Sequence, residues 1–410
     1  MSAFTLRARW VVPVAMPPIE GGYVAIAGAR IAAVGGPEAI VGPVEDLGDV
    51  ALLPGLVNAH CHLEFSSLTR PLGEPGSPLP QWIAQVIVER KRADRNATAA
   101  VAAGMAESLA AGVTTIGEIA TNQPSVYATA TPRPRLALLH EAIGFSAARS
   151  DSVFADVASR AEQAAADGAS VLASGVSPHA PYTVHPELVS RLADWAAGRD
   201  APIAMHLAES PEELQLLAAG AGPFRELLDQ RSMWDPGAIP AGTRPVDYLR
   251  RLAAAPRALA VHGNYFGAEE IEFLAAHRDR LSVVYCPRTH GYFGHEPYPL
   301  AAMQKAGVRV VLGTDSRASN PDLNLWSEAR AAMELHPTLS PEAALGMATL
   351  DSAGALGLEN QVGSLAIGRF ADLATVPLVG EGDVLAEVLN SSNVTRIWLA
   401  GRSVLPEPLA

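Results

Sequence analysis

The chain has 410 residues, of which 49% are hydrophobic and 18% are charged. This composition is typical of a globular protein with a sizeable core and excludes disorder as the main state. Asp and Glu number 43 against 30 Lys and Arg, and the net charge of −13 lacks the basic field that nucleic-acid binding requires. We therefore expect no nucleic-acid partner.

The cysteine content and the N-terminus indicate the compartment. Only Cys61 and Cys286 occur, which argues against a disulfide framework. Arg7 and Arg9 interrupt the apolar residues of segment 1–16, so it lacks the order of a secretory signal. No apolar run reaches the length of a membrane span. We expect a soluble, cytoplasmic protein with no membrane partner.

The two chain ends have the texture of β-structure. Short apolar stretches at 10–12 and 23–27, divided by Pro and Gly, predict a small β unit over residues 1–53. Strand-like pieces return after Gly357, at 363–367, 371–376 and 394–399. We expect residues 1–53 and 358–410 to form one small β-sandwich domain.

Between these ends, short apolar runs alternate with longer segments of helical period, which is typical of βα units around a parallel sheet. Eight strands are predicted, at 51–58, 112–119, 135–141, 170–177, 202–207, 258–262, 281–286 and 308–313. Ser210, Asn320 and Ser340, each followed by Pro, are predicted to begin helices. The pattern predicts a (β/α)₈ TIM-type barrel over residues 54–357.

Residues that can bind a metal or transfer protons stand at the predicted strand ends. His60 and His62 are two apart on an extended segment, so both imidazoles face one side, whereas Cys61 faces the other and is interpreted as a core residue. The fifth predicted strand ends near His206, and Glu209 follows three residues later. His262 stands at the end of the sixth predicted strand and Asp315 follows the eighth. Any one of them is explained as a local cap or turn, but their joint placement on the catalytic rim of a barrel points to a site.

These residues resemble the metal-dependent amidohydrolase superfamily, in particular its cytosine deaminase-like and chlorohydrolase branch, which includes S-adenosylhomocysteine and aminofutalosine deaminases. The similarity covers nearly the whole chain and is most specific at 54–62, 177–183, 206–209, 286–287 and 313–315. It implies that His60, His62, His206 and Asp315 hold a metal, that Glu209 shuttles protons, and that His262 and Asp315 act on the attacking water. It also implies that His179 lies near the substrate.

The lysine content separates branches of this superfamily. Its binuclear members bridge two metals through a carboxylated Lys on the fourth strand, and this sequence has no Lys between Lys91 and Lys305. We therefore expect one divalent ion, with zinc as the first expectation, while iron and manganese suit the same ligands. Such an ion lowers the pKa of a bound water, and the resulting hydroxide would attack an amine-bearing ring carbon.

Two segments are candidates for substrate recognition, and in both the role of the residues stays open. In the loop 286–295, Arg288 could clamp a carboxylate or pair with an acidic neighbour, Phe293 could stack on a ring or belong to the core, and His290 is a further candidate contact. The helical segment 80–90 is a lid or a homodimer contact, and Trp82 a substrate contact or core residue.

Three functions remain to be weighed. The first is deamination of a purine, pyrimidine, pterin or adenosine-type nucleoside. The second is hydrolysis of a ring chloride or a cyclic amide, as in imidazolonepropionase. The third, a non-catalytic scaffold, is disfavoured because the ligand set and Glu209 are complete.

Overall fold

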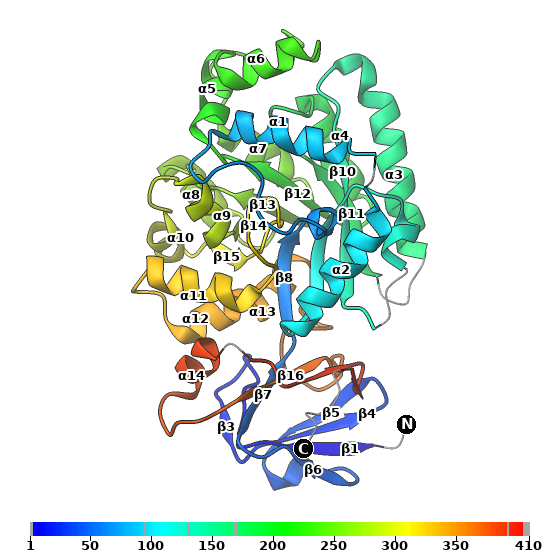
Figure 1. Cartoon of the computed structure of the whole chain (residues 1–410), viewed down its shortest axis with the longest axis vertical. Coiled ribbons are helices and arrows are strands. Elements are labelled where there is room, and N and C mark those ends of the chain that lie inside the picture. The colour runs from blue at the N-terminus through cyan, green and yellow to red at the C-terminus, as the bar shows by residue number, and fades with distance from the viewer. Residues whose placement is uncertain (1–2, 94, 129–131, 167–170, 392, 405–410) are drawn as a thin grey trace.

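The computed structural model describes residues 3–93, 95–128, 132–166, 171–391 and 393–404. Figure 1 shows strands surrounded by helices above a smaller unit of strands, to which both the first and the last parts of the chain contribute. Ser170 of the predicted fourth strand, and residues 1–2, 392 and 405–410 of the predicted terminal domain, lie outside the described residues.

The larger unit is built on a parallel sheet of eight strands in sequential order, and this confirms the predicted barrel. Its strands are β8 (Leu56–Cys61), β9 (Val113–Ala120), β10 (Arg135–Ala142), β11 (Val171–Pro178), β12 (Pro202–Leu207), β13 (Arg257–His262), β14 (Leu281–Tyr285) and β15 (Arg309–Leu312). A bridge between Cys61 and Asp315 joins the first strand to the end of the last. Neighbouring strands are joined by the crossover connections that parallel pairing requires.

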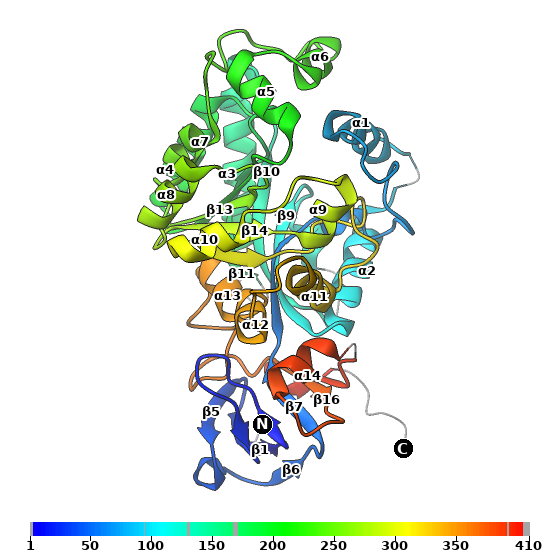
Figure 2. The ribbon, with the colours of Figure 1, turned by 90° about the vertical axis from the view of Figure 1, so that its left-hand side faces the viewer.

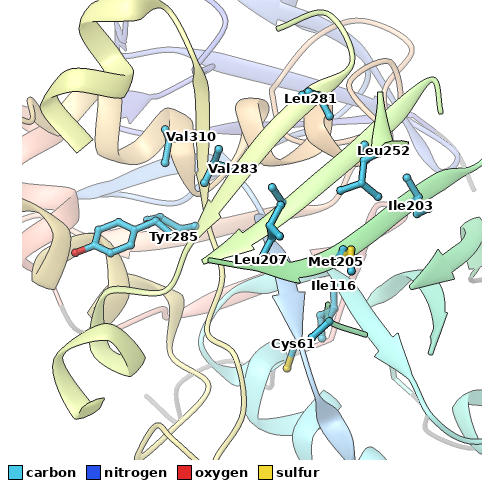
Figure 3. Close-up of a cluster of buried hydrophobic side chains, with 14 of the residues drawn as sticks. Cys61, Ile116, Ile203, Met205, Leu207, Leu252, Leu281, Val283, Tyr285 and Val310 are labelled. Carbon is cyan, nitrogen blue, oxygen red and sulfur yellow. The ribbon is translucent and has the colours of Figure 1, made fainter. Parts of the chain in front are cut away.

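Strand β12 shows how the period of two residues sorts side chains between the two faces of the barrel. Ile203, Met205 and Leu207 belong to the large hydrophobic cluster that packs against the helices, as Figure 3 shows. Ala204 and His206 alternate with them; Ala204 belongs to the separate inner cluster. His206 therefore faces inward because of its place in the strand.

Fourteen α-helices lie in the described residues, and most of them surround the barrel (Figure 2). They are α1 (Leu79–Arg90), α2 (Ala97–Ala110), α3 (Ser150–Ala166), α4 (Pro186–Ala197), α5 (Pro211–Ala219), α6 (Pro223–Gln230), α7 (Pro245–Leu252), α8 (Ala268–Ala276), α9 (Pro287–Phe293), α10 (Leu300–Ala306), α11 (Leu325–Leu335), α12 (Pro341–Met347), α13 (Leu350–Ala355) and α14 (Val384–Asn390). No helix among the described residues has the length and apolar character to cross a membrane.

Two of the three predicted helix starts are confirmed. Ser210 and Ser340 accept hydrogen bonds from backbone N–H groups of the first turns of α5 and α12. The start predicted at Asn320 is wrong, because α11 begins at Leu325 and is capped by Asn324. Asn320 is buried and its amide donates to Glu328 and to the Thr314 carbonyl, so its hydrogen bonds hold a loop.

The first predicted strand, 51–58, is divided between two sheets. Its first part is β7 (Val50–Pro54) in the terminal unit and its second part is β8 in the barrel. The division falls at Gly55, where an added Cβ would lie 2.1 Å from the Thr114 hydroxyl oxygen. Only a glycine leaves room for the chain to pass between the two units so close to β9.

The terminal unit is a two-layered sandwich, as predicted. One sheet contains β5 (Arg30–Gly35), β4 (Tyr23–Ala27), β1 (Phe4–Arg7) and β6 (Val44–Asp46). The other contains β18 (Arg402–Ser403), β17 (Arg396–Leu399), β16 (Leu373–Pro377), β7, β2 (Trp10–Val11) and β3 (Ile19–Glu20). Leu6 and Val24 from the first sheet share a core with Leu52, Leu373 and Trp398 from the second.

The strand predicted at 363–367 is wrong, since these residues form turns and irregular chain. Gly363 has a φ of 84°, and a Cβ there would lie 2.7 Å from the Cβ of Ala353 in α13. Its left-handed conformation turns the chain tightly past that helix.

Candidate metal centre and its pocket

Three histidines and one aspartate meet inside the carboxyl end of the barrel. His60 and His62 come from the end of β8, His206 from β12, and Asp315 follows β15. One ring nitrogen of each histidine lies within 4.8 Å of those of the other two, and His62 Nε2 is 3.2 Å from His206 Nε2. Asp315 Oδ1 lies 3.7 Å from the Nε2 atoms of both His60 and His62. The structure thus brings together the four predicted ligands.

Hydrogen bonds to neighbouring groups orient these ligands. His206 Nδ1 lies 2.9 Å from the carbonyl oxygen of His179, which can only accept, so Nδ1 carries the hydrogen and Nε2 presents its lone pair. Asp315 has a φ of 54°, and its Oδ2 accepts a hydrogen bond from the Ser319 hydroxyl at 2.9 Å. This leaves Oδ1 on the side of the histidines.

The donor atoms fit a divalent metal ion. Both ring nitrogens of His60 and the Nδ1 of His62 are buried without a hydrogen-bond partner among the described residues. Burial lowers the pKa of His62, and burial together with His60 lowers that of His206 to about 3, so both imidazoles are neutral. Burial alone would raise the pKa of Asp315, but the surrounding histidines hold it below its usual range. Neutral imidazoles around a carboxylate form a set that zinc, iron or manganese can use.

Glu209 and His262 form a second pair beside these ligands. Glu209 lies between β12 and α5, and its Oε1 is 3.4 Å from His262 Nε2. Burial, with contributions from the charges of Asp315 and Glu213, raises the pKa of Glu209 well above its ordinary value. Burial therefore favours the protonated form of Glu209, the form that a general acid needs.

The backbone around Glu209 is held by side chains that the sequence did not single out. Glu213, which is fully buried, accepts hydrogen bonds from the backbone N–H groups of Ala208 and Glu209 at 2.8 and 3.0 Å. The side-chain amide of Asn264 donates to the Glu209 carbonyl at 2.9 Å, and its Oδ1 lies 3.1 Å from His290 Nδ1. Glu213 stands three residues after Ser210, where an acidic residue is typical of a helix start, and no spacing in the sequence marks Asn264.

A hydrogen bond from a neighbouring side chain also holds the backbone at His262. Its φ of 72° is in the left-handed region, which a histidine seldom adopts, and the Tyr298 hydroxyl donates to its carbonyl oxygen at 2.9 Å. The buried Tyr298 thus stabilises the turn that directs the His262 ring toward Glu209.

A cavity of about 300 Å³ opens above these residues. Its floor contains His62, His179, His206, Glu209, His262 and Asp315. Its walls come mainly from α1 and from α6 with the residues that follow it, and are formed by Trp82, Ile83, Val86, Ile87, Phe224, Leu227, Leu228 and Met233. The volume is in the range of small-molecule sites, and the apolar walls with a polar floor are typical of them.

The predicted substrate contacts divide into two groups. His179 and Trp82 line the cavity, and Trp82 also donates from Nε1 to the Ala318 carbonyl and packs edge-on against Phe293. Arg288 and His290 are not among the lining residues. Arg288 forms a two-point ion pair with Asp322 at 2.6 and 3.1 Å, and His290 contacts Asn264, so the structure favours a supporting place for both.

The predicted segment 80–90 is helical and covers the cavity as α1. At its C-terminal end, Arg90 donates to Glu64, which follows the His60–His62 pair, and reaches within 3.4 Å of Glu141 at the end of β10. Burial works against the Arg90 charge, but these carboxylates raise its pKa overall. The helix is thereby tied to the barrel rim beside the histidines.

Comparison with known proteins fits this arrangement. The amidohydrolase family profile matches residues 51–404. The chain belongs to the amidohydrolase family. This match confirms the predicted family and the prediction that the protein is a hydrolase.

Its relatives include named deaminases. A 5-methylthioadenosine/S-adenosylhomocysteine deaminase from Moorella thermoacetica is 31% identical over 396 residues, covering 92% of this chain and 86% of that protein. An aminodeoxyfutalosine deaminase from Deinococcus radiodurans is 31% identical over 335 residues, covering 78% of each chain.

Among solved structures, a zinc-bound adenosine deaminase from Xanthomonas campestris matches with a TM-score of 0.81 at 28% identity, over 97% of this chain and 92% of that one. A triazine hydrolase variant matches with a TM-score of 0.83 at 20% identity, over 100% and 96% of the two chains. At that identity the second match shows a shared fold only.

Proposed function

We propose that this amidohydrolase removes the amino group of an adenosine-type nucleoside by hydrolysis, with one divalent ion, zinc first, held by His60, His62, His206 and Asp315. The proposal rests on one observation: His62, His206 and Asp315, which lie together with His60, line a single cavity with Glu209, whose pKa is raised. The names of its deaminase relatives support the choice of bond and of nucleoside.

The reaction consumes water and exchanges a ring C–NH₂ for C=O with release of ammonia. When bound, the ion lowers the pKa of a water and stabilises developing negative charge. Asp315 accepts a proton from the attacking water, and His262 orients that water. Glu209 delivers one proton to the ring nitrogen next to the reacting carbon, takes up the hydroxyl proton of the adduct as the C=O bond forms, and gives this second proton to the departing amine as the C–N bond breaks. The proton held by Asp315 then returns to Glu209.

The experiment is a substrate screen with the zinc-loaded protein and, in parallel, the iron-loaded protein. Adenosine-type nucleosides, amino-purines, amino-pyrimidines and pterins are offered, and ammonia is measured together with the organic product. We expect one ammonia for each nucleoside converted. Chloride or a ring-opened product without ammonia would instead support the alternative bonds, and no turnover of any compound would support a scaffold.

A further inference from the structure

The hydroxyl of Tyr182 is a polar group of the cavity that plays no part in the proposed reaction. Tyr182 is 2% exposed and lines the same cavity as Glu209. Its hydroxyl oxygen is buried and makes no hydrogen bond of ordinary geometry to any residue that the structure describes. A buried hydroxyl without a partner costs free energy, and one beside a cavity is available to a group whose charge changes during a reaction.

The ring of Tyr182 is held from two sides. It stacks on Phe224 of α6, with ring centroids 3.9 Å apart and an angle of 15° between the ring planes. It also meets His179 edge-on, with ring centroids 5.8 Å apart. Tyr182 lies in the turn that follows β11, where the backbone N–H of Thr183 donates to the Ala180 carbonyl at 3.0 Å. These contacts leave the ring little freedom, so the position of the hydroxyl is set by the fold.

The carboxyl group of Glu209 is the neighbour with which this hydroxyl interacts most. Burial raises the pKa of Tyr182 well above its usual value, and among the charged groups Glu209 contributes most to that rise. Burial, Asp315 and Glu213 raise the pKa of Glu209, whereas the Tyr182 hydroxyl lowers it. A hydroxyl that donates to a carboxylate acts in this direction, because the hydrogen bond favours the charged form.

We propose that the Tyr182 hydroxyl donates a hydrogen bond to the Glu209 carboxylate whenever Glu209 has given up its proton, and that Tyr182 is thereby a positioning residue for proton transfer. This inference rests on the proposed role of Glu209 in deamination. When Glu209 protonates the ring nitrogen, a negative charge is left in a cavity with apolar walls, where an unpaired charge is costly. The donated hydrogen bond stabilises that charge, and Tyr182 keeps its own proton throughout.

The test is Tyr182→Phe, which removes the hydroxyl and keeps the ring that stacks on Phe224. Ammonia release by the zinc-loaded protein gives kcat and KM for the nucleoside that the wild type converts. We expect kcat to fall by about tenfold to a hundredfold, the usual range for a hydrogen bond to a charged group, while KM stays nearly unchanged.

The pH profile supplies a readout that a loss of packing would not move. Without the donated hydrogen bond the charged form of Glu209 is disfavoured, so the pKa of Glu209 rises. Activity needs protonated Glu209, and the basic limb of kcat/KM should therefore shift to higher pH in Tyr182→Phe. The other titratable groups that interact with Glu209 are His262, Asp315 and Glu213, and this variant leaves all three in place.

Tyr127→Phe is the matched control. The Tyr127 hydroxyl is buried in the same way and also makes no hydrogen bond of ordinary geometry to the described residues, but Tyr127 is not among those that line the cavity. This variant should leave kcat and the basic limb unchanged. Thermal unfolding and metal analysis of both variants separate the loss of the hydroxyl from a loss of fold or of metal.

Infrared difference spectra recorded through a pH titration measure the protonation of Glu209 without turnover, and Glu209→Gln identifies its carboxyl band. An unshifted pKa of Glu209 in Tyr182→Phe, or a wild-type kcat in that variant, would overturn this inference while leaving the deaminase proposal standing. If the wild type releases ammonia from no nucleoside, the deaminase proposal fails, and the infrared titration still decides whether the hydroxyl of Tyr182 bonds to Glu209.

Discussion

Glu209 owes its raised pKa to its surroundings in the fold. A carboxyl group in water loses its proton near pH 4, whereas burial and the nearby carboxylates raise the pKa of Glu209. Within one cavity, the surroundings favour the protonated form of Glu209 and the ionised form of Asp315. The proposed hydrolysis uses both forms, a neutral acid that donates a proton and an ionised carboxylate that accepts one.

Replacing Glu209 by Gln should abolish turnover while leaving the bound metal unchanged. The amide has nearly the same shape but cannot give up and regain a proton at the ring nitrogen and the amine. We expect kcat to fall by at least about 100-fold, the usual size of a general-acid contribution. Metal analysis and ammonia release on the same sample check this, and full activity of the variant would refute the role.

Glu213→Gln should move the pH profile. Burial raises the pKa of Glu213 to about 7, so its charge is present above neutrality, where it helps to keep Glu209 protonated. Without that charge the pKa of Glu209 falls. Since activity needs protonated Glu209, the basic limb of kcat/KM should shift to lower pH.

The glutamine side chain of this variant has one acceptor oxygen where the Glu213 carboxylate has two, so one of the backbone N–H groups of Ala208 and Glu209 loses its partner. This loss should lower the free energy of unfolding by about 1–3 kcal/mol. Glu212→Gln removes the neighbouring carboxyl, which is not buried, and is the control for charge alone. An unshifted basic limb in Glu213→Gln, with intact metal, would show that Glu213 only supports the fold.

At the scale of elements, Gly55 joins the sandwich to the barrel. Gly55→Ala should lower the free energy of unfolding by about 1–3 kcal/mol, because the new methyl group meets the Thr114 side chain and β8 or β9 must shift. Denaturant unfolding measures the change. Gly291→Ala is the matched control, since a Cβ there meets nothing within 4 Å and the residue lies inside α9. Equal stability of both variants would mean that the junction relaxes freely.

The elements also show what sequence patterns can and cannot predict. The grouping of the proposed ligands followed from strand ends, because a period of two residues fixes which side chains face inward and parallel strands end on one rim. The division at Gly55 was missed because residues 51–57 are continuously apolar apart from Pro54 and that glycine, and such a run does not say to which sheet each part belongs. Pairing decides that, through distant residues of β16.

Loop side chains were harder to predict for a related reason. The guanidinium group of Arg288 could bind a substrate carboxylate, but its partner Asp322 is 34 positions away and only the fold brings the two side chains together.

The sequence also did not predict that α6 forms a wall of the pocket. Its apolar residues are as typical of a core-facing helix as of a pocket, so periodicity alone does not separate the two.

At the scale of the whole molecule, the proposed metal ligands come from distant parts of the barrel. His60 and His62 belong to the first strand, His206 to the fifth, and Asp315 follows the last. Zinc should therefore stabilise the folded protein by about 2.7 kcal/mol at a hundredfold excess over Kd, and Tm should rise accordingly. Calorimetry with zinc and with a chelator measures this rise in Tm.

His206→Ala should bind less metal and lose most of the rise in Tm. Unchanged metal content in that variant would remove His206 from the ligand set.

The sandwich has a consequence for the order in which the protein is made. Strand β7 is synthesised before the barrel, but its partner β16 and the Trp398 side chain that covers the same core come after it. Until residues 373–403 leave the ribosome, strands β16, β17 and β18 are missing from the sheet that contains β7 and β2. The apolar side chains of Leu52 and Val11, which are buried in the finished fold, then lack the packing partners that these strands supply. The unit that comes first in the sequence is thus the last one that translation can complete.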